Sequence, residues 1–221
     1  VARTAMLQVA PNLIRQYVEL ITFLSINPSM ATGSTARTAP PIGSADYIVR
    51  QARKFAEARY PRAPSPPRTV PDELVSEILV AYYGVRVEDI PRIKREHSLS
   101  MSAENIVGDL LERYLASVLE PNCWVWCSGA TITSVDFIKP PAEEGAAWKK
   151  VQVKNRSNSE NSSSSSVRSG TDIQKWHRSD AASGRTLWGD FPAPETVSSL
   201  SEAGFRSFTT TYLAQLRREV L

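Results

Sequence analysis

The segment that most constrains the fold is the run from Lys149 to Arg156, in which apolar and polar side chains alternate. Side chains two residues apart on a β-strand point to the same face. Val151 and Val153 are therefore predicted to face the core. Gln152 and Lys154 share the other face, so the strand presents a polar pair on an apolar scaffold.

A second strand is predicted to lie beside this one and to supply a carboxylate. The segment SVDFI, residues 134–138, precedes the run and is joined to it by a short polar loop. A short connection makes neighbouring strands antiparallel partners. Asp136 is then expected to meet Gln152 and Lys154 at the edge of the sheet. A carboxylate, an amide oxygen and an ammonium group placed together can hold a hard cation and activate water.

These residue types suit metal-dependent cleavage of a phosphodiester. Mg²⁺ prefers oxygen ligands in octahedral geometry, so Asp136, one further side-chain oxygen, a backbone carbonyl and the scissile phosphate can complete a site. Lys154 can orient or deprotonate the attacking water and offset charge that develops on phosphorus. The second ligand in such a pattern is usually an acid. Gln152 offers a carbonyl oxygen without charge, which is expected to weaken metal binding.

A helix is predicted over residues 101–120, directly before these strands. Its apolar residues recur at helical spacing, and Ser102 is the expected N-cap. Glu104, Gly108 and Glu112 recur every four residues and form one stripe. Glu112 is therefore a candidate third metal ligand that reaches the site from the helix. The alternative is that Glu112 is a solvated carboxylate on the helix surface.

The segment after Lys154 is rich in amide, hydroxyl and basic side chains. Residues 149–185 carry eight Lys or Arg against three Asp or Glu, a local charge of +5, whereas the whole chain has a net charge of +3. Such a segment favours contact with phosphates, and Asn, Arg and Lys can read base edges. Residues 155–178 are interpreted as a DNA-contacting loop in which Thr171 begins a short helix; the alternative is a serine-rich linker. The candidate contacts are Asn155, Arg156, Asn158, Asn161, Arg168, Lys175 and Arg178.

The rest of the chain is predicted to be mainly helical. Helices are expected over residues 7–24 and 44–60, with Pro-rich joints that cannot continue them, and over residues 72–83, ending at Gly84. The segment 194–221 suggests two short helices broken at Gly204.

Two domains are expected, joined in one compact unit. Residues 1–70 form a helical N-terminal extension, and residues 71–221 carry the sheet and the candidate site.

Composition indicates the cellular compartment of the protein and which covalent or metal cross-links it can contain. With 42% hydrophobic residues the chain can bury a sizeable core, but no apolar run is long enough to cross a bilayer. A cytoplasmic protein without a membrane partner is therefore expected.

Cys123 and Cys127 lie four residues apart on an expected strand. Their Cα atoms would then be roughly 13 Å apart, which is too far for a disulfide. With only two histidines, a structural zinc site is not expected, nor is any cofactor beyond the catalytic metal.

Several blocks of this sequence together resemble one enzyme family. AENIVGDLLERYL, SVDFI, QVKNRSNSENSSSSSVRSGTDIQKWHR, TLWGDFP and LSEAGF are similar to type II restriction endonucleases of the SinI kind, within the PD-(D/E)xK nuclease superfamily. The resemblance spans about residues 71–213. It implies an α/β fold, with a central mixed sheet flanked by helices, and Mg²⁺-dependent cleavage of double-stranded DNA at a short, nearly palindromic site of the GGWCC type.

The resemblance also assigns roles to residues of this chain. Asp136, Gln152 and Lys154 fall on the catalytic positions, and Glu112 on that of the helix acid; Asp136, Gln152 and Glu112 are the implied metal ligands. A palindromic site implies a two-fold symmetric homodimer, because each half-site needs an equivalent reader. Two alternatives stay open: a structure-specific repair or junction nuclease of the same superfamily, and a DNA-binding module in which Gln152 marks a lost metal site.

Overall fold

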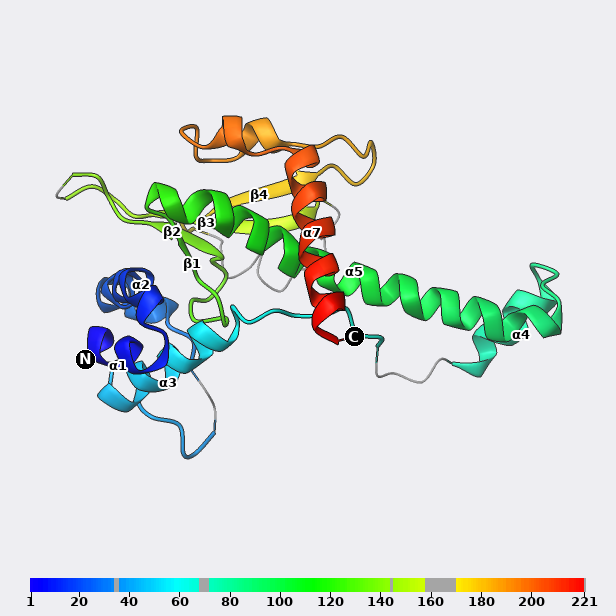
Figure 1. Cartoon of the computed structure of the whole chain (residues 1–221), viewed down its shortest axis with the longest axis horizontal. Helices are drawn as coiled ribbons and strands as arrows, with labels where there is room; N and C mark the ends of the chain where they lie inside the picture. Colours follow the sequence, from blue (N-terminus) through cyan, green and yellow to red (C-terminus); the bar gives the residue numbers. More distant parts are fainter. Residues whose placement is uncertain (34–35, 68–71, 144, 158–169, 221) are drawn as a thin grey trace. The chain divides into compact units, whose positions relative to one another are not determined.

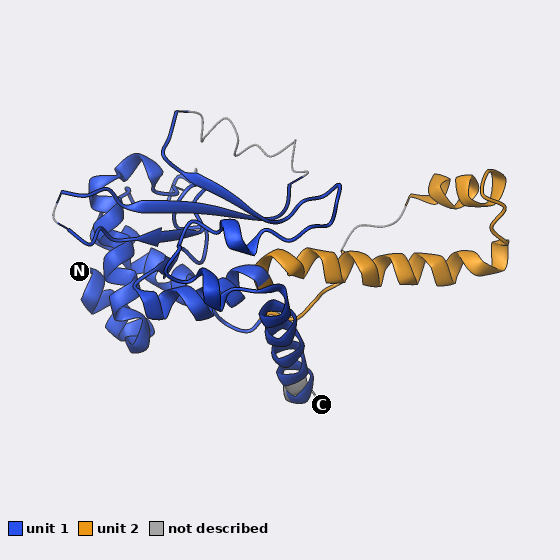
Figure 2. Cartoon of the chain, turned by 90° about the horizontal axis from the view of Figure 1, so that it is seen from above, with its two compact units in different colours: residues 1–61, 111–221 blue, residues 62–110 orange. Residues whose placement is uncertain are grey.

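The computed structural model describes residues 1–33, 36–67, 72–143, 145–157 and 170–220. The chain forms two compact units, which Figure 2 distinguishes by colour: residues 1–61 together with 111–221, and residues 62–110. The first unit contains the β-sheet, the N-terminal helices and the C-terminal helix. Within the described residues, none of the helices combines the length and apolar character needed to cross a membrane.

A four-stranded mixed sheet forms the centre of the first unit (Figure 1). The strands follow one another in chain order, with β1 antiparallel to β2, β2 antiparallel to β3, and β3 parallel to β4. Their bounds are Val125–Trp126 for β1, Phe137–Lys139 for β2, Lys149–Arg156 for β3 and Gln174–Ser179 for β4. The α/β class, the mixed sheet and the antiparallel pairing of the two central strands confirm the expectations from the sequence.

The strand β4 replaces the short helix that the sequence suggested after Thr171, so that prediction is wrong. Trp176 is buried at 4% exposure and pairs with Val153 of β3, and its indole Nε1 donates to the carbonyl of Leu187 at 2.9 Å. An ion pair between Lys150 and Asp172 joins the start of β3 to the segment before β4. Packing against β3 outweighs the weak local preference of this polar segment.

Three N-terminal helices share a core with the sheet: α1 (Ala2–Val9), α2 (Ile14–Ile26) and α3 (Ala45–Glu57). The segment around Pro11 separates the first two, as proline cannot continue a helix. Ser44 caps α3, because its hydroxyl accepts the amide of Tyr47 at 3.2 Å. The shared cluster contains fully or largely buried residues of the helices and of one face of the strands, among them Met6, Tyr17, Leu20, Phe23, Phe55, Val125, Cys127 and Ile138.

The helix α5 (Ile90–Leu119) begins well before the predicted start, so Ser102 is not its N-cap. Ser102 lies buried within the helix. The earlier start is favourable because Pro91 falls in the first turn, where proline is tolerated, and Arg92 pairs with Glu96 one turn later at 3.0 Å. Short 3₁₀ turns connect the longer elements at Pro11–Leu13, Pro28–Met30, Val87–Asp89, Glu120–Asn122, Trp188–Asp190 and Val197–Ser199.

The C-terminal helix α7 (Glu202–Val220) is continuous, so the predicted break at Gly204 is wrong. A Cβ atom added at Gly204 would lie 2.5 Å from the hydroxyl of Tyr114. Glycine is therefore needed at this position for close packing of α7 on α5. Phe205 follows it and lies with its ring centroid 5.6 Å from that of Tyr114.

The second unit is a helical hairpin. The helix α4 (Glu73–Ala81) starts at Asp72, whose carboxylate accepts the amide of Leu74 at 2.9 Å, and ends before Gly84, which has a φ of +67°. This agrees with the predicted cap and stop signals. Lys94 of α5 forms an ion pair with Glu73 at 3.1 Å, which joins the two arms of the hairpin.

Candidate active site

Asp136 lies directly before β2 and is held by the strands on both sides. Its amide donates to the carbonyl of Val151 at 2.9 Å, and its carbonyl accepts the amide of Cys127 at 2.8 Å. The side-chain Oδ2 accepts the amide of Val153 at 2.7 Å. The carboxylate is therefore bonded to the backbone of β3 in the middle of the predicted Gln-x-Lys segment.

Gln152 and Lys154 lie on one face of β3, as the alternation predicted. Val151 and Val153 are buried on the other face. The carboxylate of Asp136 bonds the backbone of β3 between Gln152 and Lys154, and the charge of Lys154 acts on it, so the three residues lie close together. The structure thus brings these three side chains to one region. Gln152 is 4% exposed and Lys154 is half-buried.

The electrostatics of Asp136 reflect this setting. Burial is the largest influence and raises the pKa of the carboxyl group, while the bond from Val153 and the charge of Lys154 lower it. The pKa is raised overall. The protein therefore compensates the charge of this carboxylate only in part, which is favourable for a site that receives a cation.

The neighbouring strand β4 adds two basic side chains to the same face. The parallel register places Lys175 opposite Gln152 and His177 opposite Lys154. Lys175 and, at the end of β3, Arg156 are exposed, whereas His177 is half-buried. The sequence interpretation missed His177 because it assigned a helix here; a strand assignment in register with β3 would have placed it beside Lys154.

Two of the predicted DNA contacts lie on the opposite face. The Nε of Arg178 donates to Oδ1 of Asn155 at 2.8 Å, and its Nη1 forms an ion pair with Glu202 of α7 at 2.7 Å. The guanidinium group also lies 5.4 Å from the ring centroid of Phe205. These contacts tie β3 and β4 to α7. Three further candidates, Asn158, Asn161 and Arg168, lie outside the described residues.

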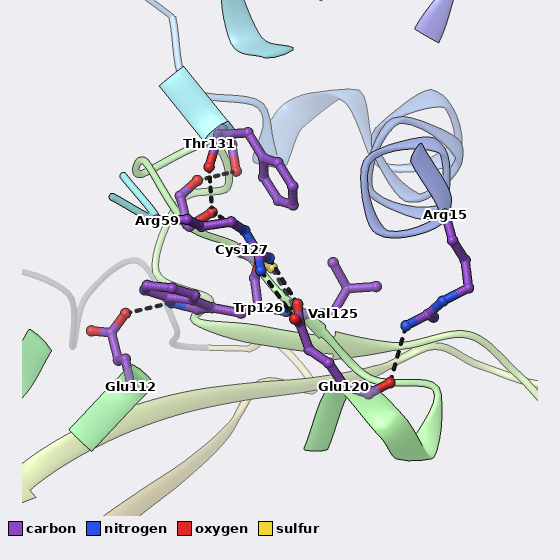
Figure 3. A network of polar contacts seen from close by, with 10 residues as sticks. Arg15, Arg59, Glu112, Glu120, Val125, Trp126, Cys127 and Thr131 are labelled. Atoms are coloured by element: carbon purple, nitrogen blue, oxygen red, sulfur yellow. Dashed lines mark hydrogen bonds and ion pairs between the residues drawn. The ribbon is translucent and has the colours of Figure 1, made fainter. Parts of the chain in front are cut away.

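Glu112 approaches the sheet from α5 and contacts β1. Its Oε2 accepts the indole Nε1 of Trp126 at 2.8 Å (Figure 3). Burial is the main cause that raises the pKa of Cys127, and the charges of Asp136 and Glu112 raise it further. The two carboxylates therefore lie within electrostatic range of the same thiol, although they reach it from different elements.

An ion-pair network fixes β1 next to these carboxylates (Figure 3). Arg59, just after α3, binds Glu120 through two bonds of 2.7 and 3.0 Å, and the two side chains are only 12% and 16% exposed. Arg59 also donates to the carbonyl of Trp126 at 2.9 Å and to the hydroxyl of Ser128 at 3.0 Å. The network holds the C-terminal end of β1 and thereby the position of Cys127, whose amide donates to the carbonyl of Asp136.

The donor set at this site suits a hard cation. Among the described residues, no group of three or more His, Cys, Asp or Glu side chains is arranged to hold a metal ion. A cation would instead be held by the carboxylate of Asp136 together with the amide oxygen of Gln152. Oxygen donors of this kind, completed by water and phosphate oxygens, are what Mg²⁺ prefers.

Comparisons with known proteins identify relatives along nearly the whole chain. The family described as SinI restriction endonuclease matches residues 1–215. The type II restriction enzyme Eco47I of Escherichia coli is 44% identical over 216 residues, which cover 97% of this chain and 94% of that enzyme. The type II restriction enzyme SinI of Salmonella infantis is 43% identical over 217 residues, covering 98% and 94%. The chain belongs to the SinI restriction endonuclease family, and its activity is that of a type II restriction enzyme, a site-specific deoxyribonuclease.

Proposed function

We propose that the protein uses Mg²⁺ to cleave double-stranded DNA, and that Asp136, Gln152, Lys154 and Glu112 form the catalytic site. The observation that carries this proposal is the position of Asp136, whose carboxylate accepts the amide of Val153, between Gln152 and Lys154, at 2.7 Å and feels the charge of Lys154. A carboxylate, an amide oxygen and an ammonium group are then present where a scissile phosphate would bind.

Each of these groups has a distinct role. Asp136 and Gln152 would hold the cation, and Glu112 would supply a further carboxylate from α5. A bound divalent cation neutralises charge on the phosphate and lowers the pKa of a coordinated water. Lys154 orients the water for attack on phosphorus and stabilises the negative charge that develops in the transition state. The half-buried position of Lys154 excludes part of the solvent, which strengthens that stabilisation.

DNA contacts are proposed on the same face of the sheet. Arg156 and Lys175 are exposed there and are placed to bind backbone phosphates. Asn158, Asn161 and Arg168 remain predicted contacts. For Asn155 and Arg178, DNA contact would have to occur alongside their bonds to each other and to Glu202.

The substrate is proposed to be a short, nearly palindromic sequence of the GGWCC type, cut in the cytoplasm by a homodimer. The specific sequence rests on the resemblance of the QVKNRSNSENSSSS block. Two-fold symmetry follows from the substrate, because each half-site presents the same groups to one subunit.

Plasmid digestion tests this function. Wild-type protein with Mg²⁺ is expected to give discrete fragments whose sequenced ends define one site, and a chelator is expected to abolish cleavage. Asp136→Asn keeps the shape of the side chain but removes its charge, so it should still bind a site-containing duplex while cleavage falls by about 100-fold or more. Discrete cutting by Asp136→Asn at the wild-type rate would exclude Asp136 as the anchor of the metal.

A further inference from the structure

The second unit carries an unusually apolar surface. No residue of α4 is buried. Within the described residues, eight of the thirteen exposed large hydrophobic side chains of the chain fall between residues 74 and 99. They are Leu74, Val75, Ile78, Val80, Tyr82, Tyr83, Val87 and Leu99, with exposed fractions from 36% to 81%. Scattered apolar residues on a surface need no explanation, but such a concentration marks a site of association.

The two arms of the hairpin also leave a groove between them. A cavity of about 460 Å³ is lined by Val75 and Leu79 of α4 and by Ile93, His97 and Met101 of α5. Lys94 and Asp72 stand among the lining residues and carry its main charges. An apolar groove of this size can receive one or two large side chains from a partner.

Charge separates this surface from the proposed DNA-binding face. Residues 62–110 contain six Lys or Arg and eight Asp or Glu, a net charge of −2, whereas residues 149–185 carry +5. A phosphate backbone would be repelled by the first surface and attracted by the second. Several charged side chains around the apolar residues are moreover paired with each other, as Lys94 is with Glu73 and Arg92 with Glu96.

We propose that the apolar surface of this hairpin, formed by the eight exposed side chains and the groove, is where two copies of this chain associate. The inference rests on the proposed two-fold symmetric function. A stable interface needs about 800 Å² from each partner. Eight large apolar side chains that are one third to four fifths exposed offer an area of that order. Because it carries charges of both signs in similar number, and several of them are paired with each other, the surface can meet its own copy without facing a block of like charge.

The oligomeric state measured without DNA and without metal tests the interface independently of catalysis. Sedimentation equilibrium is expected to give wild type twice the 24.4 kDa of one chain. Ile78→Glu combined with Tyr82→Glu places two charges on exposed positions, so the fold should be kept and the dimer dissociation constant should rise by about 100-fold or more. Ile26→Glu is the matched control, since Ile26 is 62% exposed but lies outside the hairpin, and it should remain dimeric.

The outcomes separate this inference from the proposed function. A wild type that is monomeric yet cuts plasmid at one site overturns the interface and leaves the function intact. A folded double variant that stays dimeric, or dissociation of Ile26→Glu to the same extent, also overturns the interface. Dissociation of the double variant alone, with unchanged circular dichroism and thermal midpoint, supports it. A dimer that cuts no DNA under any condition supports the interface and contradicts the proposed function.

Discussion

At the scale of single residues, Gln152 distinguishes this site from an acid-rich metal centre. It is the proposed second ligand, is 4% exposed, and lies next to Val153, whose amide bonds the carboxylate of Asp136. A carboxylate there would bind a cation more strongly, but two buried carboxylates side by side repel each other when no cation is present. Glutamine avoids this repulsion at the expense of metal affinity. The residue therefore reflects a balance between the stability of the metal-free fold and the strength of metal binding.

The variant Gln152→Glu tests that balance. Without metal, the added charge is expected to lower the thermal midpoint, because a second buried carboxylate near that of Asp136 is repelled by it. Mg²⁺ should restore the thermal midpoint, and the Mg²⁺ concentration for half-maximal cleavage should fall. Thermal unfolding with and without Mg²⁺ gives the first result and a metal titration of cleavage the second. Gln174→Glu, at an exposed position of β4, is the control and should change neither quantity. Equal responses of both variants to Mg²⁺ would show that residue 152 is not a ligand.

At the scale of secondary structure elements, the pair of Arg59 and Glu120 connects α3 to β1. Both side chains are largely buried, and the carboxylate binds the guanidinium group through two bonds. Removal of one partner from such a pair leaves the other charge buried and uncompensated. Arg59→Ala is therefore expected to lower the free energy of unfolding by about 3 kcal/mol.

A matched control exists for this substitution. Arg92 binds Glu96 in a comparable ion pair, but its side chain is 55% exposed. Arg92→Ala is expected to lower the free energy of unfolding far less, because water solvates the remaining charge. Urea unfolding of both variants measures the difference. If the two losses are equal, burial of the Arg59 pair does not determine its contribution.

An element could be predicted from the sequence where the interactions that form it are between residues close in the chain. The alternation in β3 and the short connection to β2 are local, so the shared face of Gln152 and Lys154 and the approach of Asp136 to β3 could be foreseen. β4 could not, because its only strongly apolar residue is Trp176 and its partner strand lies about 20 residues away. Gly204 likewise suggested a helix break. Glycine is needed at this position because the hydroxyl of Tyr114, which is distant in sequence, lies where a Cβ atom would be.

The same limit applies to the side chains of the site. The bond between Glu112 and Trp126 and the bonds from Arg178 to Asn155 and Glu202 depend on how elements pack. Residue type alone could identify these groups as polar and suitable for metal or DNA. It could not show that Arg178 and Asn155 lie on the face opposite Lys154.

The carboxyl group of Glu195 makes the stability of the protein depend on pH in the acid range. Burial raises the pKa of Glu195, but bonds from Lys139, the backbone and Trp124 outweigh it and lower the pKa from 4.5 to about 2. A carboxyl group with a depressed folded-state pKa contributes stability that is present above its unfolded value. That contribution is lost as the pH falls from about 4.5 towards 2.

Glu195→Gln should therefore flatten the acid limb of the stability profile. The thermal midpoint of wild type is expected to fall more steeply between pH 4.5 and 2 than that of the variant, with the two profiles converging at the acid end. Glu88→Gln, at a side chain that is 70% exposed, serves as the control and should keep the wild-type profile. A Glu195→Gln profile parallel to wild type throughout would contradict this assignment.

At the scale of the whole molecule, the chain separates its charges between regions. The segment from residue 149 to 185 carries +5 and includes β3 and β4, while the hairpin from residue 62 to 110 carries −2 and most of the exposed apolar side chains. The proposed DNA contacts and the proposed self-association thereby fall on different segments of the chain. A dimer built in this way has two catalytic sites, and each is expected to serve one strand of the duplex.

A mixed dimer tests this division of work between subunits. Wild-type and Asp136→Asn chains with different affinity tags can be co-expressed and the heterodimer isolated by two successive affinity steps. Because only one subunit then carries the anchoring carboxylate, a supercoiled plasmid with one site should be converted to the open circular form and only slowly to the linear form. A doubly tagged dimer with two wild-type chains should give mainly linear product.

If Asp136→Asn also carries Ile78→Glu and Tyr82→Glu, the heterodimer should no longer be recovered. Linear product formed by the mixed dimer at the wild-type rate would mean that one subunit cuts both strands, and the two-site scheme would be wrong.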